Sequence, residues 1–418
     1  MDLENIKAEI ANLVKQYYLK SKYENITPVR YGGSVHDDEE LIEMVNAILD
    51  GWWVNGKRTK EFENAFKKYL SVKHSVFCNS GSSALILALE SLKLKQGSEV
   101  ISPALTFPTT INPAIRSGMK VVLVDSDIGT YNINVDKLEQ AITNDTKALI
   151  IPHLLGNTSD MDRIMDLVST HNLFLIEDCC EALGSKYRNK MLGSFGDCAT
   201  FSFFPSHHIS AGGGGMFTTN NDEFYLRSLS LKNWGRQYSN IEYIPNQGLI
   251  RSDYIQQYTY EEIGYNFNAS EIEAAKGIVQ MGKINKLNEF RENNFQVLFD
   301  FFKKYEDYFI LPETTKNAKP AWFAFPLTIK SASVKGKFNR EDLMSFLFKK
   351  QIETRYILAG NIARQPAYSK IKFKIVGNLD NADRIFKDSF FIGLYPGITS
   401  EKMKYLKECF EEFFSTLH

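Results

Sequence analysis

Between residue 75 and about residue 230, short apolar runs alternate with longer stretches of helical periodicity. The runs are rich in valine, isoleucine and phenylalanine and end in small or polar residues; they read SVFCN, EVISPA, KVVLVD, ALIIPH and LFLIED. Continuous apolar strands separated by helices are typical of a parallel sheet that is covered on both faces. Because ligands of such sheets bind at the carboxyl ends of the strands, the residues after each run are the first candidates for function.

The flanking parts of the chain follow other patterns. A helical pattern from 270 to about 306 precedes two apolar runs, AWFAFPLTIK and FFIGLYPG, which are accompanied by predicted helices at 340–350 and 401–416. Such a mixture of strands and helices predicts a smaller α+β domain. We therefore expect an N-terminal helical segment at 1–60, a large α/β domain at 61–285 and a small C-terminal α+β domain at 286–418.

One segment of the large domain shows little periodicity. Residues 237–262 are polar and rich in tyrosine, which predicts a long loop or lid. Loops of this length are usually functional. The chain contains no internal repeat and no low-complexity tract.

Charge and hydropathy exclude several classes of function. The chain has 49 lysines and arginines against 50 acidic residues and no basic run, so we expect no nucleic-acid partner. No stretch approaches the roughly 18 apolar residues of a membrane span. The first twenty residues mix acids and bases at helical spacing and lack the apolar core of a signal peptide. We therefore expect a cytoplasmic protein without a membrane partner.

The cysteines point to a reduced protein. They are odd in number and most lie in apolar stretches, which predicts core thiols and no disulfide; they are Cys78, Cys179, Cys180, Cys198 and Cys409. The adjacent Cys179 and Cys180 raise the alternative of a metal site. A metal needs further ligands at suitable spacing, and the sequence has no C-x-x-C motif, so we expect no metal.

Two stretches are candidates for binding a phosphate. NSGSSALILALESL follows an apolar run and opens a predicted helix, so Ser80, Gly81 and Ser82 can form an anion cradle at the start of that helix. Serine and glycine also cap helices for purely structural reasons, and that alternative stays open. Ser202, in SFFPSHH, offers a hydroxyl to the same kind of group.

Three further residues suit a flat, ring-shaped cofactor. Asp178 closes the run LFLIED, where a carboxylate can pair with the ring nitrogen of a pyridoxal cofactor or can be an ordinary turn acid. Phe107 follows another run and can stack on a ring or belong to the core. His207 lies five residues after Ser202 and can be a base or a structural residue.

Taken together and in this order, these stretches resemble a known family. NSGSSA, TFPTTINP, LIEDCCEALGSKY, GSFGDCATFSFFPSHH, KNWGR and GYNFNASEIEAAKG are similar to the DegT/DnrJ/EryC1/StrS aminotransferases, a branch of the fold type I pyridoxal-phosphate (PLP) enzymes. The resemblance covers nearly the whole chain. It implies a large domain with a mainly parallel sheet between helices, a small C-terminal α+β domain, and PLP or pyridoxamine phosphate (PMP) as cofactor.

The resemblance also implies roles for individual residues. It places Asp178 at the ring nitrogen, Glu181 near the ring hydroxyl and Phe107 on the ring. It assigns the cofactor phosphate to Ser80, Gly81, Ser82 and Ser202. It lets Asn266 reach the phosphate of a neighbouring subunit's cofactor, so a homodimer with shared active sites is expected. The resemblance also implies that substrate is bound by His208, Arg236, Arg355 and Asn361.

His207 stands where the family has the lysine that holds the cofactor covalently. This replacement resembles a smaller subgroup, the CDP-4-keto-6-deoxyglucose 3-dehydrases and GDP-4-keto-6-deoxymannose 3-dehydratases. The resemblance implies that the PMP amine condenses with a nucleotide-linked 4-keto-6-deoxyhexose, that His207 removes a proton, and that the C3 hydroxyl is lost. Such a lyase would serve 3,6-dideoxysugar and lipopolysaccharide O-antigen biosynthesis. A sugar aminotransferase and a non-catalytic PLP-binding protein remain alternatives.

The chain departs from the subgroup in two places. Its cytidine-sugar members carry a [2Fe-2S] cluster on four cysteines, yet segment 237–262 has no cysteine, and Cys180 alone cannot hold a cluster. We therefore expect no cluster, and L-glutamate as the donor that restores PMP. Gly213 stands where the family usually has an acid. The sequence offers no account of that glycine.

Overall fold

The structure, a computed structural model, describes residues 2–21, 25–237 and 258–417. Most of the predicted loop or lid at 237–262 lies outside the described residues. The chain divides into two compact units; the first is Met1–Glu24, Ser34–Lys93 and Asp197–Ile284, and the second is Asn25–Gly33, Leu94–Gly196 and Asn285–His418. The division into 1–60, 61–285 and 286–418 stays a prediction.

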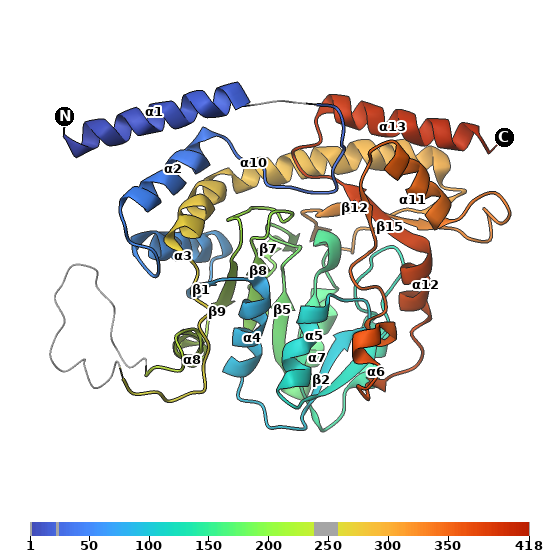
Figure 1. Ribbon diagram of the computed structural model, residues 1–418. Coiled ribbons are helices and arrows are strands. Elements are labelled where there is room, and N and C mark those ends of the chain that lie inside the picture. Colours follow the sequence, from blue (N-terminus) through green and yellow to red (C-terminus); the bar gives the residue numbers. More distant parts are fainter. Residues whose placement is uncertain (1, 22–24, 238–257, 418) are drawn as a thin grey trace. The chain divides into compact units, whose positions relative to one another are not determined.

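The first unit combines helices with a three-stranded antiparallel arrangement. Its strands are β1 (His74–Cys78), β8 (Cys198–Ser202) and β9 (Gly215–Thr219). Its described helices are α1 (Leu3–Ser21), α2 (Asp38–Leu49), α3 (Lys57–Leu70), α4 (Gly81–Ser91), α8 (Asp222–Lys232) and the first part of α10 (Glu271–Phe302). The helix α4 packs on β8 and β9, and α3 packs on β1 (Figure 1).

Two helices of the first unit are held by a long-range cap. The Glu271 carboxylate accepts hydrogen bonds from three backbone N–H groups at the start of α3, those of Gly56, Arg58 and Thr59, at 2.8, 2.8 and 3.0 Å. Helix starts leave such N–H groups without partners inside the helix, so an acceptor there stabilises them. Because Glu271 is the first residue of α10, this contact joins the starts of the two helices.

The second unit contains a parallel sheet. Its strand order is β5-β4-β2-β3-β14, and every neighbouring pair is parallel. The strands are β2 (Glu99–Pro103), β3 (Lys120–Val124), β4 (Thr146–Pro152), β5 (Phe174–Asp178) and β14 (Lys374–Ile375). All residues of β2 are buried, as expected for a strand covered on both faces. The helix α5 (Pro108–Arg116) packs on β3 and β4 (Figure 1).

Two smaller sheets complete the second unit. An antiparallel sheet has the order β10-β12-β15-β13, and a three-stranded one has the order β11-β6-β7. Their bounds are β6 (Lys186–Tyr187), β7 (Lys190–Met191), β10 (Phe309–Ile310), β11 (Ala318–Lys319), β12 (Ala324–Ile329), β13 (Thr354–Arg355) and β15 (Ser389–Gly393). The remaining α-helices are α6 (Val135–Ala141), α7 (Met161–His171), α11 (Arg340–Lys349), α12 (Asp380–Asp388) and α13 (Ser400–Ser415). Short 3₁₀ turns are η1 (Leu154–Gly156), η2 (Lys303–Tyr305), η3 (Ile362–Arg364) and η4 (Pro366–Tyr368).

The predicted α/β fold class is confirmed. The five apolar runs of the sequence form β1 to β5, and the later runs form β12 and β15. One feature that the sequence did not predict is β14, whose Lys374 and Ile375 pair in parallel with Val122 and Leu123 of β3. A two-residue strand carries no periodic signal, so the pattern could not reveal it. None of the described helices combines the length and the apolar character that a membrane crossing requires.

Candidate active site

The predicted phosphate-binding residues of the first unit lie at the ends of two strands. The strand β9 pairs antiparallel with both β1 and β8, so β1 and β8 run in the same direction. Gly215 of β9 is opposite both Cys78, the end of β1, and Ser202, the end of β8. Neighbouring strands are about 4.8 Å apart, which puts these two ends roughly 10 Å apart. The structure therefore brings the segment that follows Cys78 to the same edge of this three-stranded arrangement as Ser202, the edge at which β1 and β8 end.

The start of α4 follows β1 at this edge. Ser80 is the N-cap residue, and its hydroxyl oxygen accepts a hydrogen bond from the Ser83 N–H at 3.1 Å. The Ser83 hydroxyl in turn donates to Asn79 Oδ1 at 2.6 Å. Ser80 thus has the structural role of a cap. The first-turn N–H groups of Gly81 and Ser82 have no intrahelical acceptor, which is the arrangement that binds anions at helix starts.

Gly215 allows β9 to lie directly against this helix start. A Cβ atom at position 215 would lie 2.4 Å from the Gly81 nitrogen and 2.4 Å from the Ser80 carbonyl carbon. No side chain fits at such distances without moving the backbone. The cradle at the start of α4 therefore depends on the absence of a side chain at this position.

We expect the Gly215→Ala substitution to displace the start of α4 and to weaken PLP binding. Overpacking of this kind costs about 1–3 kcal/mol of unfolding free energy. Thermal unfolding and a PLP titration measure the two effects. The matched control is Gly282→Ala, because Gly282 lies in α10 with nothing within 4 Å of its added Cβ. That control should be stabilised by about 0.5–1 kcal/mol. Unchanged PLP affinity in Gly215→Ala would contradict the expectation.

The loop after β8 carries His207. The Ala211 N–H donates to the Phe203 carbonyl at 3.1 Å and closes the base of the loop. The His207 N–H donates to the Phe204 carbonyl at 2.9 Å and forms a turn in its middle. His207 is partly exposed, whereas His208 is only 3% exposed. This difference in exposure favours His207 for contact with a ligand and a structural role for His208.

The structure gives a physical reason for Gly213. A Cβ atom at position 213 would lie 2.7 Å from Oε1 of Glu273, in the first turn of α10. The same carboxylate accepts hydrogen bonds from the N–H and the hydroxyl of Ser270, at 2.8 and 2.9 Å, and is therefore held in place. A carboxylate thus stands beside position 213, but it comes from α10, and a side chain at position 213 would require Glu273 to shift.

In the second unit, Asp178 ends β5 and is oriented by two donors. The Thr110 hydroxyl donates to Oδ2 at 2.8 Å, and the Cys180 N–H donates to Oδ1 at 3.2 Å. The side chain is 7% exposed. Thr110 belongs to α5, two residues into the helix whose N-cap residue is Phe107. Asp178 is therefore a fixed acceptor at the carboxyl edge of the parallel sheet, as the sequence predicted.

Glu181, three residues further on, is partly buried near Asp178. One of its oxygens accepts the Leu155 N–H at 2.8 Å. Burial, with a further contribution from the charge of Asp178, raises the pKa of Glu181 to about 7. A carboxyl group with this pKa is present in both protonation states near neutral pH, so Glu181 can donate a hydrogen bond as well as accept one.

Phe107 and Asn361 are placed on neighbouring segments but differ in exposure. Phe107 is 51% exposed, which is unlike a core phenylalanine and fits an aromatic face available to a flat ligand. Asn361 is fully buried. Its Nδ2 donates to Asp383 at 2.8 Å, and its Oδ1 accepts the Ala363 N–H at 3.1 Å, so its polar atoms have partners inside the protein. Leu105 forms a backbone bridge with Asn361. This geometry favours a structural role for Asn361.

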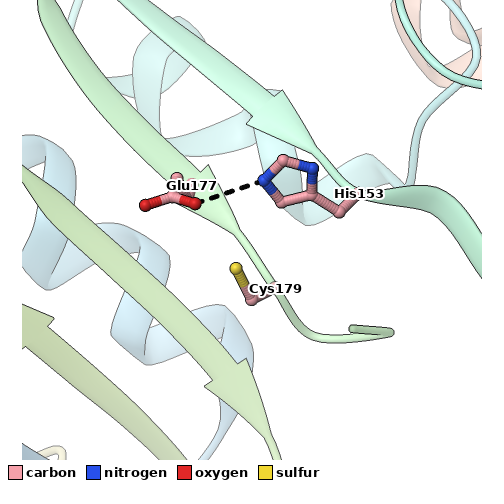
Figure 2. Close-up of side chains that lie close together, drawn as sticks. All are labelled: His153, Glu177 and Cys179. Atoms are coloured by element: carbon pink, nitrogen blue, oxygen red, sulfur yellow. Dashed lines mark hydrogen bonds and ion pairs between the residues drawn. The ribbon is translucent and has the colours of Figure 1, made fainter. Parts of the chain in front are cut away.

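A buried polar group lies directly beside Asp178 in the chain. Figure 2 shows His153 at the end of β4 with its imidazole directed at Glu177 of β5, and Cys179 next to them. His153 Nε2 is 3.4 Å from Glu177 Oε2, and the other imidazole nitrogen accepts the Ser159 N–H at 3.4 Å. Because Nδ1 accepts a hydrogen bond, it carries no proton in the neutral imidazole. Nε2 therefore carries the proton and donates to Glu177.

Glu177 is further held by three backbone N–H groups, those of Gly193, Phe195 and Gly196, at 2.9, 2.7 and 2.8 Å. Burial alone would raise the pKa of Glu177, but the hydrogen bonds from His153 and the backbone outweigh it and hold the pKa below its usual value.

The ligand atoms of His153, Glu177 and Cys179 lie within 4.8 Å of one another, which a metal site also requires. Both imidazole nitrogens and both carboxylate oxygens are already engaged in hydrogen bonds. Burial raises the pKa of the Cys179 thiol well above its usual value, so no thiolate is offered. The group is therefore best described as a hydrogen-bonded brace behind Asp178.

Comparison with known proteins adds to this geometry. Residues 35–411 match the sequence profile of the DegT/DnrJ/EryC1/StrS aminotransferase family. The chain belongs to this family. The lipopolysaccharide biosynthesis protein RfbH of Salmonella typhimurium is 38% identical over an alignment of 436 positions, which covers 99% of each chain.

Two further members of the family are similar to this chain. The dTDP-4-dehydro-2,6-dideoxy-D-glucose 3-dehydratase of Saccharopolyspora spinosa is 36% identical over 93% of this chain and 87% of its own. A crystal structure of GDP-4-keto-6-deoxymannose 3-dehydratase with a trapped PLP–glutamate geminal diamine superposes with a TM-score of 0.83. It is 30% identical and covers 91% of this chain and 99% of that one.

Membership of the DegT/DnrJ/EryC1/StrS family confirms the predicted fold type I architecture and the PLP or PMP cofactor. The residues present fit that cofactor. The start of α4, kept open by Gly215, suits the phosphate, and the oriented Asp178 carboxylate suits the ring nitrogen. The half-exposed Phe107 suits the ring face.

Of the other predicted site residues, Asn266 and Arg355 are exposed and Arg236 is partly exposed. Asn266 is exposed, and its Oδ1 accepts from the Asn268 amide at 2.9 Å. The Arg236 guanidinium lies over the Trp234 ring, 4.9 Å from the ring centroid, two residues before the part of the chain that is not described. Arg355 is exposed and lies over Tyr31 at 4.2 Å. Roles for Asn266, Arg236 and Arg355 in binding stay predictions.

Sequence reasoning missed several residues that shape the site. Thr110 was within the quoted stretch TFPTTINP but carried no separate signal. His153 ends the apolar run ALIIPH, and its position at a strand end was the one available hint. Glu177 and Glu273 contact residues in other segments of the chain, which a local motif does not reveal.

Proposed function

We propose that the protein is a PLP/PMP-dependent 3-dehydratase that removes the C3 hydroxyl of a nucleotide-linked 4-keto-6-deoxyhexose. The observation that carries this proposal is a histidine, His207, in a short closed loop directly after Ser202, where the resemblance to the family implies a lysine. A histidine cannot hold the cofactor covalently, so the cofactor is free to act as an amine-bearing cosubstrate. The two relatives described above whose names state a reaction are 3-dehydratases.

Bound PMP supplies an amine that condenses with a ketone and a ring that accepts electrons. The residues of the chain would bind the cofactor and transfer the proton. The N–H groups of Gly81 and Ser82, with the Ser202 hydroxyl, would hold the cofactor phosphate. Asp178, oriented by Thr110, would pair with the ring nitrogen and favour its protonated form. The His207 imidazole would act as the general base that accepts a proton beside the bound cofactor.

The partners of the proposed reaction follow from the same argument. L-glutamate restores the amine, because the two-electron reduction at C3 must be matched by oxidation of an amino donor. No iron–sulfur cluster is part of the proposal, since segment 237–262 has no cysteine and burial keeps Cys180 a thiol. We further propose a cytoplasmic homodimer in which the exposed Asn266 reaches the partner's cofactor, in a pathway of 3,6-dideoxysugars.

A sugar aminotransferase is the second candidate. The family to which the chain belongs is described as one of aminotransferases. In that case His207 would move a proton without loss of the C3 hydroxyl. A non-catalytic PLP-binding protein is a weaker alternative, because Asp178, Phe107 and the start of α4 all keep the geometry that the cofactor needs.

Product analysis separates these functions. We expect the protein with PMP, L-glutamate and one of the CDP-, GDP- or dTDP-4-keto-6-deoxyhexoses to form a 3-deoxy sugar. In a dehydration each 2-oxoglutarate is accompanied by one ammonia, because the amine is released by hydrolysis. A transamination retains the nitrogen in an amino sugar and releases no ammonia. An amino sugar without ammonia, or no product from any of the nucleotide sugars, would refute the proposal.

A further inference from the structure

One face of α10 borders the end of the His207 loop. Glu273, Lys276 and Gln280 are spaced three and four residues apart and therefore share a helix face. Glu273 lies against Gly213, and Gln280 Oε1 accepts the Ser210 N–H at 3.1 Å. Lys276 is between these two contacts, so its side chain is on the side of α10 that meets the segment directly after His207 and His208.

The ammonium group of Lys276 is buried with little compensation. The residue is 9% exposed, and its Nζ donates to the Ser34 hydroxyl at 2.8 Å. Within the described part of the chain, no carboxylate forms an ion pair with it. Burial lowers the pKa of Lys276, and the charge of Glu40 opposes this change. Burying an ammonium group without a counter-ion is unfavourable, so an anion bound beside Lys276 would stabilise its charged form.

A second lysine of the same helix, Lys283, has an ammonium group whose charge is compensated by carboxylates. Lys283, two turns further along α10, has ion pairs with Asp37, Glu39 and Glu40 at 2.7, 3.1 and 2.9 Å. The Glu40 carboxylate is also engaged by Gln280 at 2.6 Å and by the Asp37 N–H at 2.9 Å. Its oxygens are thus occupied by other donors, and Lys276 receives no direct contact from it.

We propose that Lys276, with the Ser34 hydroxyl beside it, binds an oxyanion of a substrate of the active site. The inference rests on the proposed function, which supplies two anionic molecules: the nucleotide sugar, with its diphosphate, and the dicarboxylate amino donor. Both offer oxygen atoms that accept charge-assisted hydrogen bonds from an ammonium group and a hydroxyl. The position beside the segment 210–213 brings this anion next to the loop that carries the base.

The test is calorimetric titration of the PMP-loaded protein with two kinds of probe. Nucleoside diphosphates (GDP, CDP and dTDP) represent the nucleotide sugar, and glutarate represents the two carboxylates of glutamate. We expect Lys276→Met to weaken one kind of probe by about tenfold to a hundredfold. Lys276→Arg, which keeps the charge, should retain most of the affinity. Loss for the nucleoside diphosphates assigns the site to the diphosphate, and loss for glutarate assigns it to the amino donor.

Thermal unfolding without ligand separates binding from a structural role. Lys276→Met should keep or raise the midpoint, because it removes a buried charge that has no ion pair in the described structure. The control Lys286→Met, at an exposed position of α10, should change neither affinity nor stability. Equal affinity of the wild-type protein and Lys276→Met for every probe would overturn the inference. The dehydratase assay is independent of these titrations, so a failure here leaves the proposed function standing.

Discussion

Replacing His207 with alanine is expected to lower the rate of sugar turnover by about a hundredfold to ten-thousandfold, which is the usual contribution of a general base. Affinity for PLP and PMP should change little, because the proposed phosphate site consists of the start of α4 and Ser202 and does not include His207. Single-turnover assays with PMP-loaded protein measure the first effect, and equilibrium titration measures the second.

One control and two further experiments make this test specific for a base at position 207. His171→Ala is the matched control, since His171 is exposed at the end of α7, and it should leave turnover unchanged. Added imidazole should restore part of the activity of His207→Ala if the lost group is a proton acceptor. His207→Lys should become labelled with cofactor after borohydride reduction and should lose dehydration. Full dehydration in His207→Ala would remove the basis of the proposed function.

Replacing Glu177 with alanine is expected to destabilise the protein by about 3–5 kcal/mol. The substitution leaves three backbone N–H groups and the His153 Nε2–H without their acceptor in a buried place. Urea unfolding monitored by fluorescence measures the change. The control Glu306→Ala removes an exposed carboxylate and should stay within about 0.5 kcal/mol of wild type. A loss below about 1 kcal/mol in Glu177→Ala would show that the brace contributes little.

The same carboxylate predicts a dependence of stability on pH. The pKa of Glu177 in the folded protein is below the ordinary glutamate value of 4.5. Its charged form therefore contributes stability above pH 4.5, and this contribution is lost as the pH falls through the folded pKa. Glu177→Gln has no charge to lose there. Its stability should fall less than that of the wild type as the pH is lowered below this value.

The brace also connects stability with function. Glu177 and Cys179 flank Asp178 in the chain, and alternate residues of a strand point to opposite faces. The hydrogen bonds on the Glu177 side hold the end of β5, while Thr110 and the Cys180 N–H orient the Asp178 carboxylate. We therefore expect Glu177→Ala to weaken PLP binding as well, although Glu177 is separated from the ligand by its own strand.

Much of the fold could be predicted from local patterns. The runs SVFCN, EVISPA, KVVLVD, ALIIPH and LFLIED became β1 to β5, because strands that are buried on both faces must be apolar throughout. Asp178 and the start of α4 were found for the same reason, since each follows such a run. The replacement of a lysine by His207 was visible once the order of the motifs indicated the family.

Other features were decided only by the tertiary structure. Gly213 had no explanation until α10 placed Glu273 against it, and Lys276 looked like an ordinary helix residue until its burial beside Ser34 was known. Asn361 and His208 were predicted to bind substrate, and their burial favours structural roles. The order of side chains along the chain thus determined the strands, the cofactor class and the proposed base. Long-range contacts decided which charges are compensated, because hydrogen bonds join residues that are 240 and 242 positions apart in the sequence.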